Sequence, residues 1–238
     1  MDRVLLADLN VERAARRAAV VVTDLANSAQ RLVREAELAG DPLAEPIGRV
    51  VRSGKSGIVQ TEHGEVFLNA HLPPARLVVV GAVHISQALA PMAKLAGYDV
   101  EIIDPRTAFA TKERFPDVTL VAEWPEAVLK ARPLDAYTAL CVITHDPKID
   151  DYPLIEALKA GCFYIGALGS RKTHARRVER LTDAGMSAQA MDRIEAPIGA
   201  DIGASTPGEI AVAILASVIE AFRKRKMFAE RRGETEAA

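Results

Sequence analysis

Residues 77–104 read LVVVGAVHISQALAPMAKLAGYDVEIID, and this stretch decides the fold class. The run LVVV at 77–80 is short and wholly apolar, which is typical of a parallel strand buried on both faces. Gly81 follows it and opens an apolar segment of helical character. A second apolar run at 100–103 ends at Asp104. The order strand, helix, strand predicts a parallel βαβ unit with a right-handed crossover.

The same alternation continues toward the C-terminus, which predicts an α/β fold with a Rossmann-like parallel sheet flanked by helices. Pro91 should kink the first helix or break it locally. Further strands are expected at 118–121, 139–144 and 163–167, and further helices at 125–131, 152–160, 170–184 and 207–225. In such a sheet the loops at the carboxyl ends of the strands carry the functional residues.

Apolar runs before Pro73 are shorter and turn signals are frequent, which predicts a smaller α+β domain. Strands are expected at 19–25 and 30–33, a helix at 42–54, and a hairpin formed by 56–61 and 65–70. The expected organisation is a small α+β domain at 1–72, a Rossmann-like domain at 73–230 and a disordered tail at 231–238.

Composition excludes several function classes. A formal net charge of −2 and an aromatic content of 5% argue against a nucleic-acid partner. The N-terminus lacks the apolar core of a signal peptide, and no stretch is long and apolar enough to span a membrane, so the cytoplasm is the expected compartment. Cys141 and Cys162 lie in apolar runs and are expected to be reduced, buried thiols.

The turn Gly81-Ala82-Val83-His84 stands where a dinucleotide fingerprint would place G-x-G-x-x-G. The second glycine position holds Val83 and the third holds Ser86, so the fingerprint is incomplete. Two interpretations stay open: the following helix N-terminus binds an anion, or the segment is a plain strand-to-helix turn.

Two charged segments follow the next strands. Asp104-Pro105-Arg106 offers a carboxylate at the position of a ribose-binding acid and a guanidinium suited to phosphate. Thr144-His145-Asp146 places an imidazole that titrates near neutrality beside a carboxylate. A simple turn and a structural His-Asp pair are the alternatives.

The segment Gly169-Ser170-Arg171 begins a helix whose first turn also contains His174. Cations at the positive end of a helix dipole are unfavourable unless an external anion offsets them, so this start is a candidate phosphate site. The later Arg176, Arg177 and Arg180 are expected to form a solvated face. Asp201, in the loop before the last helix, is a candidate for the same crevice.

The three histidines of these loops could approach one another if the loops share one crevice, and two aspartates could then complete a metal site. The residues are His84, His145 and His174 with Asp104 and Asp146. Histidines scattered over the surface are the competing interpretation, so the metal is left unknown.

Taken together, the segments LVVVGAVHISQALAPMAKLAGYDVEIIDPRTAFATKERFPD, WPEAVL, VITHDPKIDD, YIGALGSRKTHARRVERL and PIGADIGASTPGEIAVAI resemble, in order and spacing, the C-terminal domain of the XdhC/CoxI family. The similarity covers residues 66 to 220. The resemblance implies an accessory protein that binds molybdenum cofactor (molybdopterin) for sulfuration and insertion into a xanthine dehydrogenase or CO dehydrogenase-type hydroxylase.

The implied partners are the apo hydroxylase and a cysteine desulfurase, and a homodimer is a further option. Two departures from the family pattern stand out. The family commonly has GAGH where this chain has Gly81 to His84 with Val83, and residues 1 to 70 contain no counterpart of the family's N-terminal cysteine segment. The chain therefore resembles the short, split form, which works with a separate N-terminal-type chain.

The cofactor-binding candidates are Gly81, Ala82, His84, Asp104, Arg106, Thr144, His145, Asp146, Gly169, Ser170, Arg171, His174 and Asp201. No catalytic residue is assigned, because a chaperone without turnover fits the resemblance better than an enzyme. The alternatives are an NAD(P)-dependent oxidoreductase acting on a small molecule and a purely structural partner of a hydroxylase.

Overall fold

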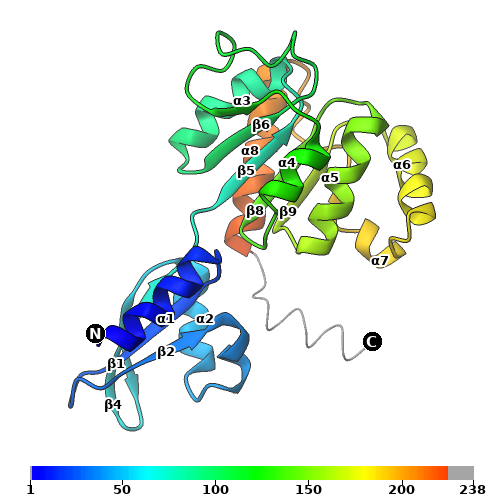
Figure 1. Cartoon of the computed structure of the whole chain (residues 1–238). Coiled ribbons are helices and arrows are strands. Elements are labelled where there is room, and N and C mark those ends of the chain that lie inside the picture. Colours follow the sequence, from blue (N-terminus) through cyan, green and yellow to red (C-terminus); the bar gives the residue numbers. More distant parts are fainter. Residues whose placement is uncertain (1, 225–238) are drawn as a thin grey trace. The chain divides into compact units, whose positions relative to one another are not determined.

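The computed structural model describes residues 2–224, which form two compact units, one from residues 2–73 and one from residues 74–222 (Figure 1). The expected tail at 231–238 and the end of the last helix at residue 225 lie outside the described residues. Each unit is described below by itself.

The smaller unit is an antiparallel sheet with helices, as the sequence predicts. Its strand order is β2-β1-β4-β3. The elements are α1 (Arg3–Ala14), β1 (Ala19–Asp24), β2 (Gln30–Arg34), the 3-10 helix η1 (Glu35–Gly40), α2 (Ala44–Ser53), β3 (Gly57–Thr61) and β4 (Gly64–His71). The sequence did not predict α1. This helix begins after Asp2, whose side chain accepts a hydrogen bond from the Leu5 N–H at 2.8 Å, and it packs Leu9 onto β1.

The larger unit contains a parallel sheet of six strands in the order β10-β9-β8-β5-β6-β7. Its elements are β5 (Arg76–Val80), α3 (His84–Leu95), β6 (Asp99–Ile103), β7 (Thr119–Val121), α4 (Pro125–Ala131), β8 (Thr138–Val142), α5 (Pro147–Ala160), β9 (Tyr164–Ala167), α6 (Arg171–Asp183), α7 (Ala188–Met191), β10 (Ile194–Glu195) and α8 (Pro207–Lys224). Along the chain, β6 and β7 follow β5 on one side of it in the sheet, and β8 then lies on the other side of β5. The topological switch point of this Rossmann-like sheet therefore lies between β5 and β8.

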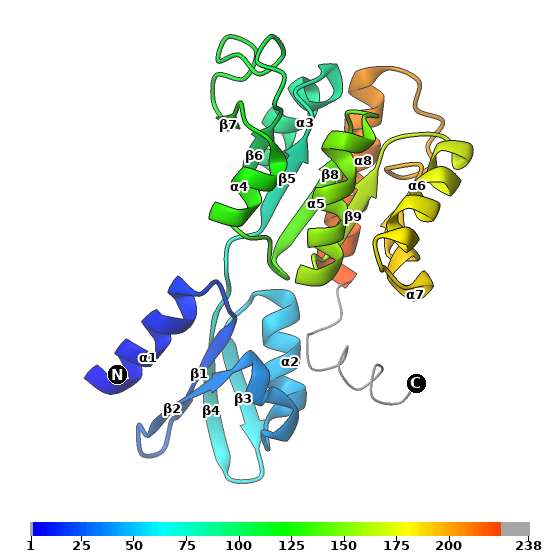
Figure 2. The same ribbon diagram turned by 45° about the vertical axis from the view of Figure 1, so that its right-hand side comes forward.

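Helices cover both faces of the sheet (Figure 2). One face packs Leu77 and Val79 of β5 against α3 and α8, and the other packs Val78 and Val80 against α4 and α5. Each strand thus sends alternate side chains into two separate cores, because successive strand residues point to opposite faces. This explains why the strands read as unbroken apolar runs and confirms the predicted fold class.

Several local details differ from the sequence expectations. Helix α3 continues past Pro91 to Leu95, and α5 begins at Pro147 rather than at 152, because Asp146 caps it by accepting from the Lys148 N–H at 3.0 Å. Cys141 and Cys162 are free and buried, as predicted. Across residues 2–224, no helix combines the length and apolar character that crossing a membrane requires.

Candidate functional site

The loops after β5, β6 and β8 meet at one rim of the parallel sheet. Val80 lies in register with Ile103 and with Val142, so the three strands end at the same level. Gly81 (φ 125°) follows β5 there, and a Cβ at this glycine would lie 3.1 Å from the Thr144 Cγ2. The structure therefore brings together the first three of the predicted loop segments.

Asp104 holds two loops of this rim together through hydrogen bonds. Its side chain is fully buried, and its carboxylate accepts from the Ala82 N–H at 2.7 Å and from the Arg106 N–H at 2.9 Å. The Arg106 guanidinium donates to both carboxylate oxygens, at 2.9 Å and 2.7 Å. Burial alone would raise the pKa of Asp104, but these hydrogen bonds outweigh it and hold the pKa below its usual value.

Side chains of the protein satisfy the backbone of the Gly81 turn. The Ala82 N–H is bonded to Asp104, and the Val83 N–H donates to the Ser86 Oγ at 2.8 Å. The Ser86 hydroxyl in turn donates to the Gly81 carbonyl at 2.7 Å. These contacts favour the turn interpretation over an open anion site. They also remove Asp104 as a free ribose acceptor, which leaves the NAD(P) alternative without support.

The segment after β8 links the rim to α5. The Thr144 Oγ1 donates to the Asp150 Oδ1 at 2.6 Å and accepts from the Asp146 N–H at 3.1 Å. His145 between them is exposed and has φ 64°, a left-handed conformation that turns the chain sharply. The pKa of Asp150 is raised by burial to about 6, although Thr144 and the charge of Arg177 act against the shift.

Asp150→Asn should make the protein more stable at neutral pH. The raised pKa means that the folded protein binds this proton more tightly than the unfolded chain, so the group lowers the free energy of unfolding as pH rises from about 4 to about 6. Asparagine keeps the acceptor for Thr144 and carries no charge. We expect a gain of about 3 kcal/mol at pH 7 that vanishes toward pH 4, measured by urea unfolding at both values. A gain of the same size at both pH values would contradict this account.

A cavity of about 390 Å³ opens between the start of α5 and one face of α6. Its lining residues are His145, Pro147, Asp150, Lys172, Thr173, Arg176, Arg177 and Arg180. Arg177 is only 2% exposed, and its Nη2 donates to the Leu168 carbonyl at 2.9 Å. Its Nε and Nη1 are buried and have no hydrogen-bond partner among the described residues. Burial lowers the pKa of Arg177, with the carboxylates of Asp150 and Asp151 opposing the shift.

The start of α6 contains the remaining basic candidates. Gly169 (φ 132°) makes the turn, and Ser170 caps the helix by accepting from the Thr173 N–H at 3.3 Å. Arg171 is exposed, whereas the Nδ1 of His174 is buried without a partner within residues 2–224. Burial lowers the pKa of His174, with a further contribution from Arg177. Neither Arg171 nor His174 lines the α5–α6 cavity.

Two candidates stand apart from these contacts. His84 is exposed at the first position of α3, and Asp201 is exposed on the loop between β10 and α8. The described part of the chain contains no cluster of three or more His, Cys, Asp or Glu side chains that could hold a metal ion. The structure therefore favours scattered histidines over the metal site considered from the sequence.

The expectation that Arg176, Arg177 and Arg180 form a solvated face is wrong for Arg177, which is buried, whereas Arg176 is exposed and Arg180 is partly exposed. All three line the cavity. A signal for this face was present in the sequence. Residues 172, 173, 176, 177 and 180 recur at helical spacing and so share one side of α6. Asp150, at the start of α5, lines the cavity opposite that side.

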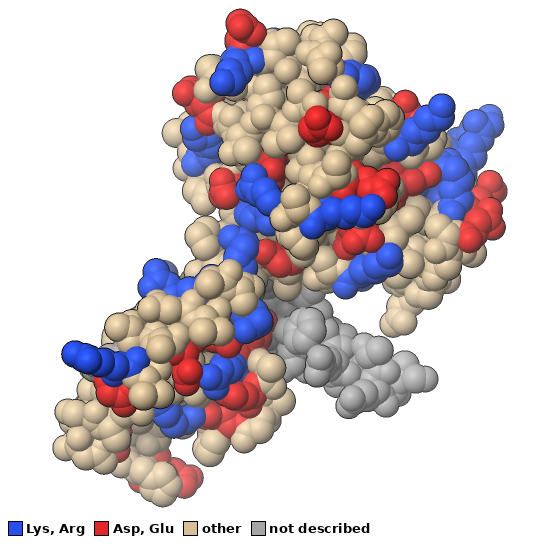
Figure 3. Space-filling view, in the orientation of Figure 1, with Lys and Arg blue, Asp and Glu red and all other residues tan. Residues whose placement is uncertain are grey.

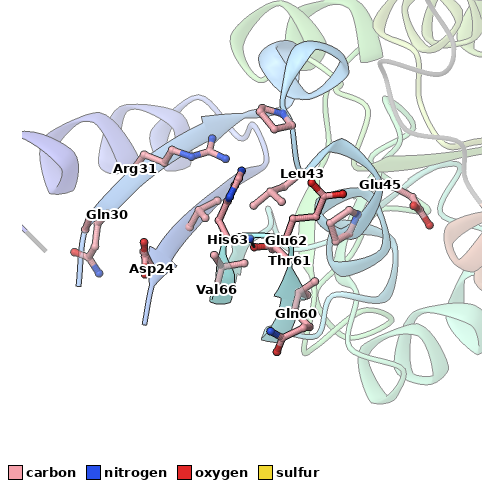
Figure 4. Close-up of a pocket in the computed structure, with 15 residues that line it drawn as sticks. Asp24, Gln30, Arg31, Leu43, Glu45, Gln60, Thr61, Glu62, His63 and Val66 are labelled. Atoms are coloured by element: carbon pink, nitrogen blue, oxygen red, sulfur yellow. Dashed lines mark hydrogen bonds between the residues drawn. The ribbon is translucent and has the colours of Figure 1, made fainter. Parts of the chain in front are cut away.

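The smaller unit has a hollow of its own, about 980 Å³ in volume, formed by the strands of its sheet and the segment that begins α2 (Figure 4). Arg31 in its wall is ion-paired with Asp41, and Asp24 accepts from the Ala26 N–H at 2.8 Å. These two charged groups are thus engaged locally, unlike Arg177 in the larger unit.

The part of the chain that matches a known family model lies in the larger unit. Residues 77–218 match the model of the XdhC Rossmann domain family. The chain is 30% identical over 177 residues to the Escherichia coli K12 protein YqeB, covering 73% of this chain and 32% of that protein. It is 32% identical over 161 residues to a Bacillus subtilis protein described as a probable xanthine dehydrogenase subunit, covering 67% of this chain and 46% of that protein.

A third relative is the molybdenum cofactor insertion chaperone PaoD of Escherichia coli K12, which is 31% identical over 146 residues, covering 61% of this chain and 40% of PaoD. The chain thus spans less than half the length of these curated relatives. A Bacillus halodurans crystal structure described as a xanthine dehydrogenase shares the fold, with a TM-score of 0.62 and 24% identity over 93% of this chain and 64% of that one. The family match and the order of the sheet agree, and the chain belongs to the XdhC Rossmann domain family.

Proposed function

We propose that this protein is a molybdenum cofactor insertion chaperone for a hydroxylase of the xanthine dehydrogenase type. The observation that carries the proposal is the convergence of three strand-end loops on one rim, beside a cavity with lysine and arginine side chains in its lining. The name of PaoD supports the same role, as does the name of the Bacillus subtilis relative. A phosphorylated ligand suits this rim because arginine and lysine side chains recognise phosphate oxygens.

The residues present fit such a ligand in charge and in position. Molybdopterin carries a phosphate group and a flat, polar pterin. His145 and Asp146, at the carboxyl end of β8, offer a donor and an acceptor for the polar edge of the pterin. Asp104 and Arg106 hold the neighbouring loops in place through their mutual hydrogen bonds, so they position the rim. Gly169 and Ser170 shape the turn that begins α6.

Sulfuration of the bound cofactor would depend on a separate cysteine desulfurase. Burial raises the pKa of Cys141 far above its usual value and that of Cys162 to about 12, so neither thiol supplies a thiolate at neutral pH. The chain would hold and shield the cofactor, the desulfurase would supply sulfur, and the apo hydroxylase would receive the product. A separate N-terminal-type chain and a second copy of this chain are the further partners we propose.

The test is to purify the full chain from cells that make molybdenum cofactor and to measure bound molybdenum and the oxidised, fluorescent pterin. We expect close to one pterin per chain, and a loss of at least fivefold for His145→Ala. The same preparation from cells unable to make the cofactor is the control. Absence of pterin from the wild-type protein, or NADH binding accompanied by hydride transfer, would contradict the proposal.

A further inference from the structure

The charge around the α5–α6 cavity is unbalanced. Four cationic side chains line it, from Lys172, Arg176, Arg177 and Arg180, and the only carboxylate in the lining belongs to Asp150. Arg180 is neutralised by Asp151, with 2.6 Å between Nε and Oδ2. Figure 3 shows lysine and arginine side chains gathered over α6, at the right-hand edge of the view. The cavity therefore presents a surplus of positive charge.

Arg177 is the least compensated of these groups. Only its Nη2 has a partner, the Leu168 carbonyl, while Nε and Nη1 are buried and unpaired among residues 2–224. Removing a guanidinium from water is strongly unfavourable unless hydrogen bonds and an opposite charge offset the lost hydration. Asp150 is too far away to form an ion pair, although its charge is felt at Arg177. The unpaired Nη1 can donate to an oxygen of a bound anion, and the positive charge of the guanidinium attracts that anion.

We infer that this cavity is a binding site for a phosphomonoester dianion, with Arg177 as a charged ligand in its wall. Lys172 and Arg176 at the mouth add charge, and the Thr173 hydroxyl adds a neutral donor. A volume of about 390 Å³ admits the phosphate together with the group that carries it. This inference deepens the proposed function, which rests in part on the same cavity, by placing the phosphate on α6 rather than on the Gly81 turn.

Asp150 lines the same cavity, and its negative charge repels a bound anion. Its carboxylate is held by the Thr144 hydroxyl at 2.6 Å, so it does not swing away when a ligand enters. Replacing it with asparagine removes a negative charge and keeps the acceptor for Thr144. Asp150→Asn should therefore bind phosphate more tightly than the wild type, which a merely structural role for the residue would not produce.

The test is calorimetric titration of the full chain with inorganic phosphate and, separately, with phenyl phosphate. We expect Arg177→Met to weaken binding of both at least tenfold and Asp150→Asn to strengthen it about threefold. Arg132→Met is the matched control, because Arg132 pairs with Glu101 and lies outside the cavity lining. This variant should bind phosphate with the wild-type affinity. Circular dichroism establishes that each variant is folded.

Lys172→Gln combined with Arg176→Gln changes only exposed side chains and covers the case in which Arg177→Met does not fold. This double variant should lose at least fivefold in phosphate affinity with an unchanged melting temperature. No phosphate binding by the wild type, or equal losses in the double variant and in Arg132→Met, would overturn the inference.

Measuring retained pterin in the same variants separates the two sources of a phosphomonoester. If Arg177→Met loses both phosphate binding and pterin, the site takes the phosphate of the cofactor. If it loses phosphate binding and keeps pterin, the site serves a different phosphorylated ligand. If the wild-type protein binds pterin but does not bind phosphate, the result would contradict this inference without contradicting the proposed function.

Discussion

Asp104→Ala is expected to lower the free energy of unfolding of the larger unit by about 3–5 kcal/mol, the range for breaking a buried ion pair. The substitution removes an acceptor that holds the Ala82 and Arg106 N–H groups and the Arg106 guanidinium. It also leaves a void at a fully buried position. Urea unfolding followed by circular dichroism gives the difference from the wild type.

The pH dependence gives this prediction a second check. Because the pKa of Asp104 is lowered in the folded protein, its contribution is present at neutral pH and is lost as pH falls through the folded pKa. The difference in free energy of unfolding between the wild type and Asp104→Ala should therefore become smaller at acidic pH. Asp99→Ala, at the exposed opposite end of β6, should stay within about 0.5 kcal/mol of the wild type. A loss below about 1 kcal/mol for Asp104→Ala would show that the rim does not depend on this carboxylate.

Gly199→Ala is expected to destabilise the larger unit by about 4 kcal/mol, combining backbone strain with overpacking. Gly199 has φ 89°, and a Cβ there would lie 2.8 Å from the Ile214 N and 2.9 Å from the Ala213 carbonyl carbon. These are backbone atoms of α8, so they cannot move aside as a flexible side chain would. The Gly199 N–H also donates to the Glu195 carboxylate at 2.6 Å, which ties β10 to this loop.

Gly203→Ala is the matched control on the same loop. Gly203 also has a positive φ, 72°, but no atom lies within 4 Å of its missing Cβ. It should cost only the conformational strain, about 1 kcal/mol. Equal losses for the two variants in thermal unfolding would mean that the close approach of Gly199 to α8 contributes nothing.

The strands of the parallel sheet could be predicted from the sequence because each packs both of its faces against helices. Burial on two sides demands an unbroken apolar run such as 77–80 or 139–142, and few other structures require one. Strand β10 was missed because its two residues are too few for a pattern. Helix α1 was missed because its buried face rests mainly on Leu9, with polar residues around it.

The site was harder to predict because hydrogen-bond satisfaction depends on neighbours distant in sequence. Asp104 has the spacing of a ribose-binding acid, yet its oxygens are occupied by Ala82 and Arg106. Arg177 lies among other basic residues in a helix of strongly polar composition, which favoured a solvated face. Only the packing of α6 against α5 shows that its guanidinium is buried. The convergence of loops at one rim followed from the parallel sheet alone.

The most direct test of the central claim is to locate bound molybdenum by anomalous X-ray scattering in crystals of the cofactor-loaded protein. The account predicts a single molybdenum peak in the larger unit, at the carboxyl ends of β5, β6 and β8. A peak at the amino ends of these strands, or in the hollow of the smaller unit, would contradict it.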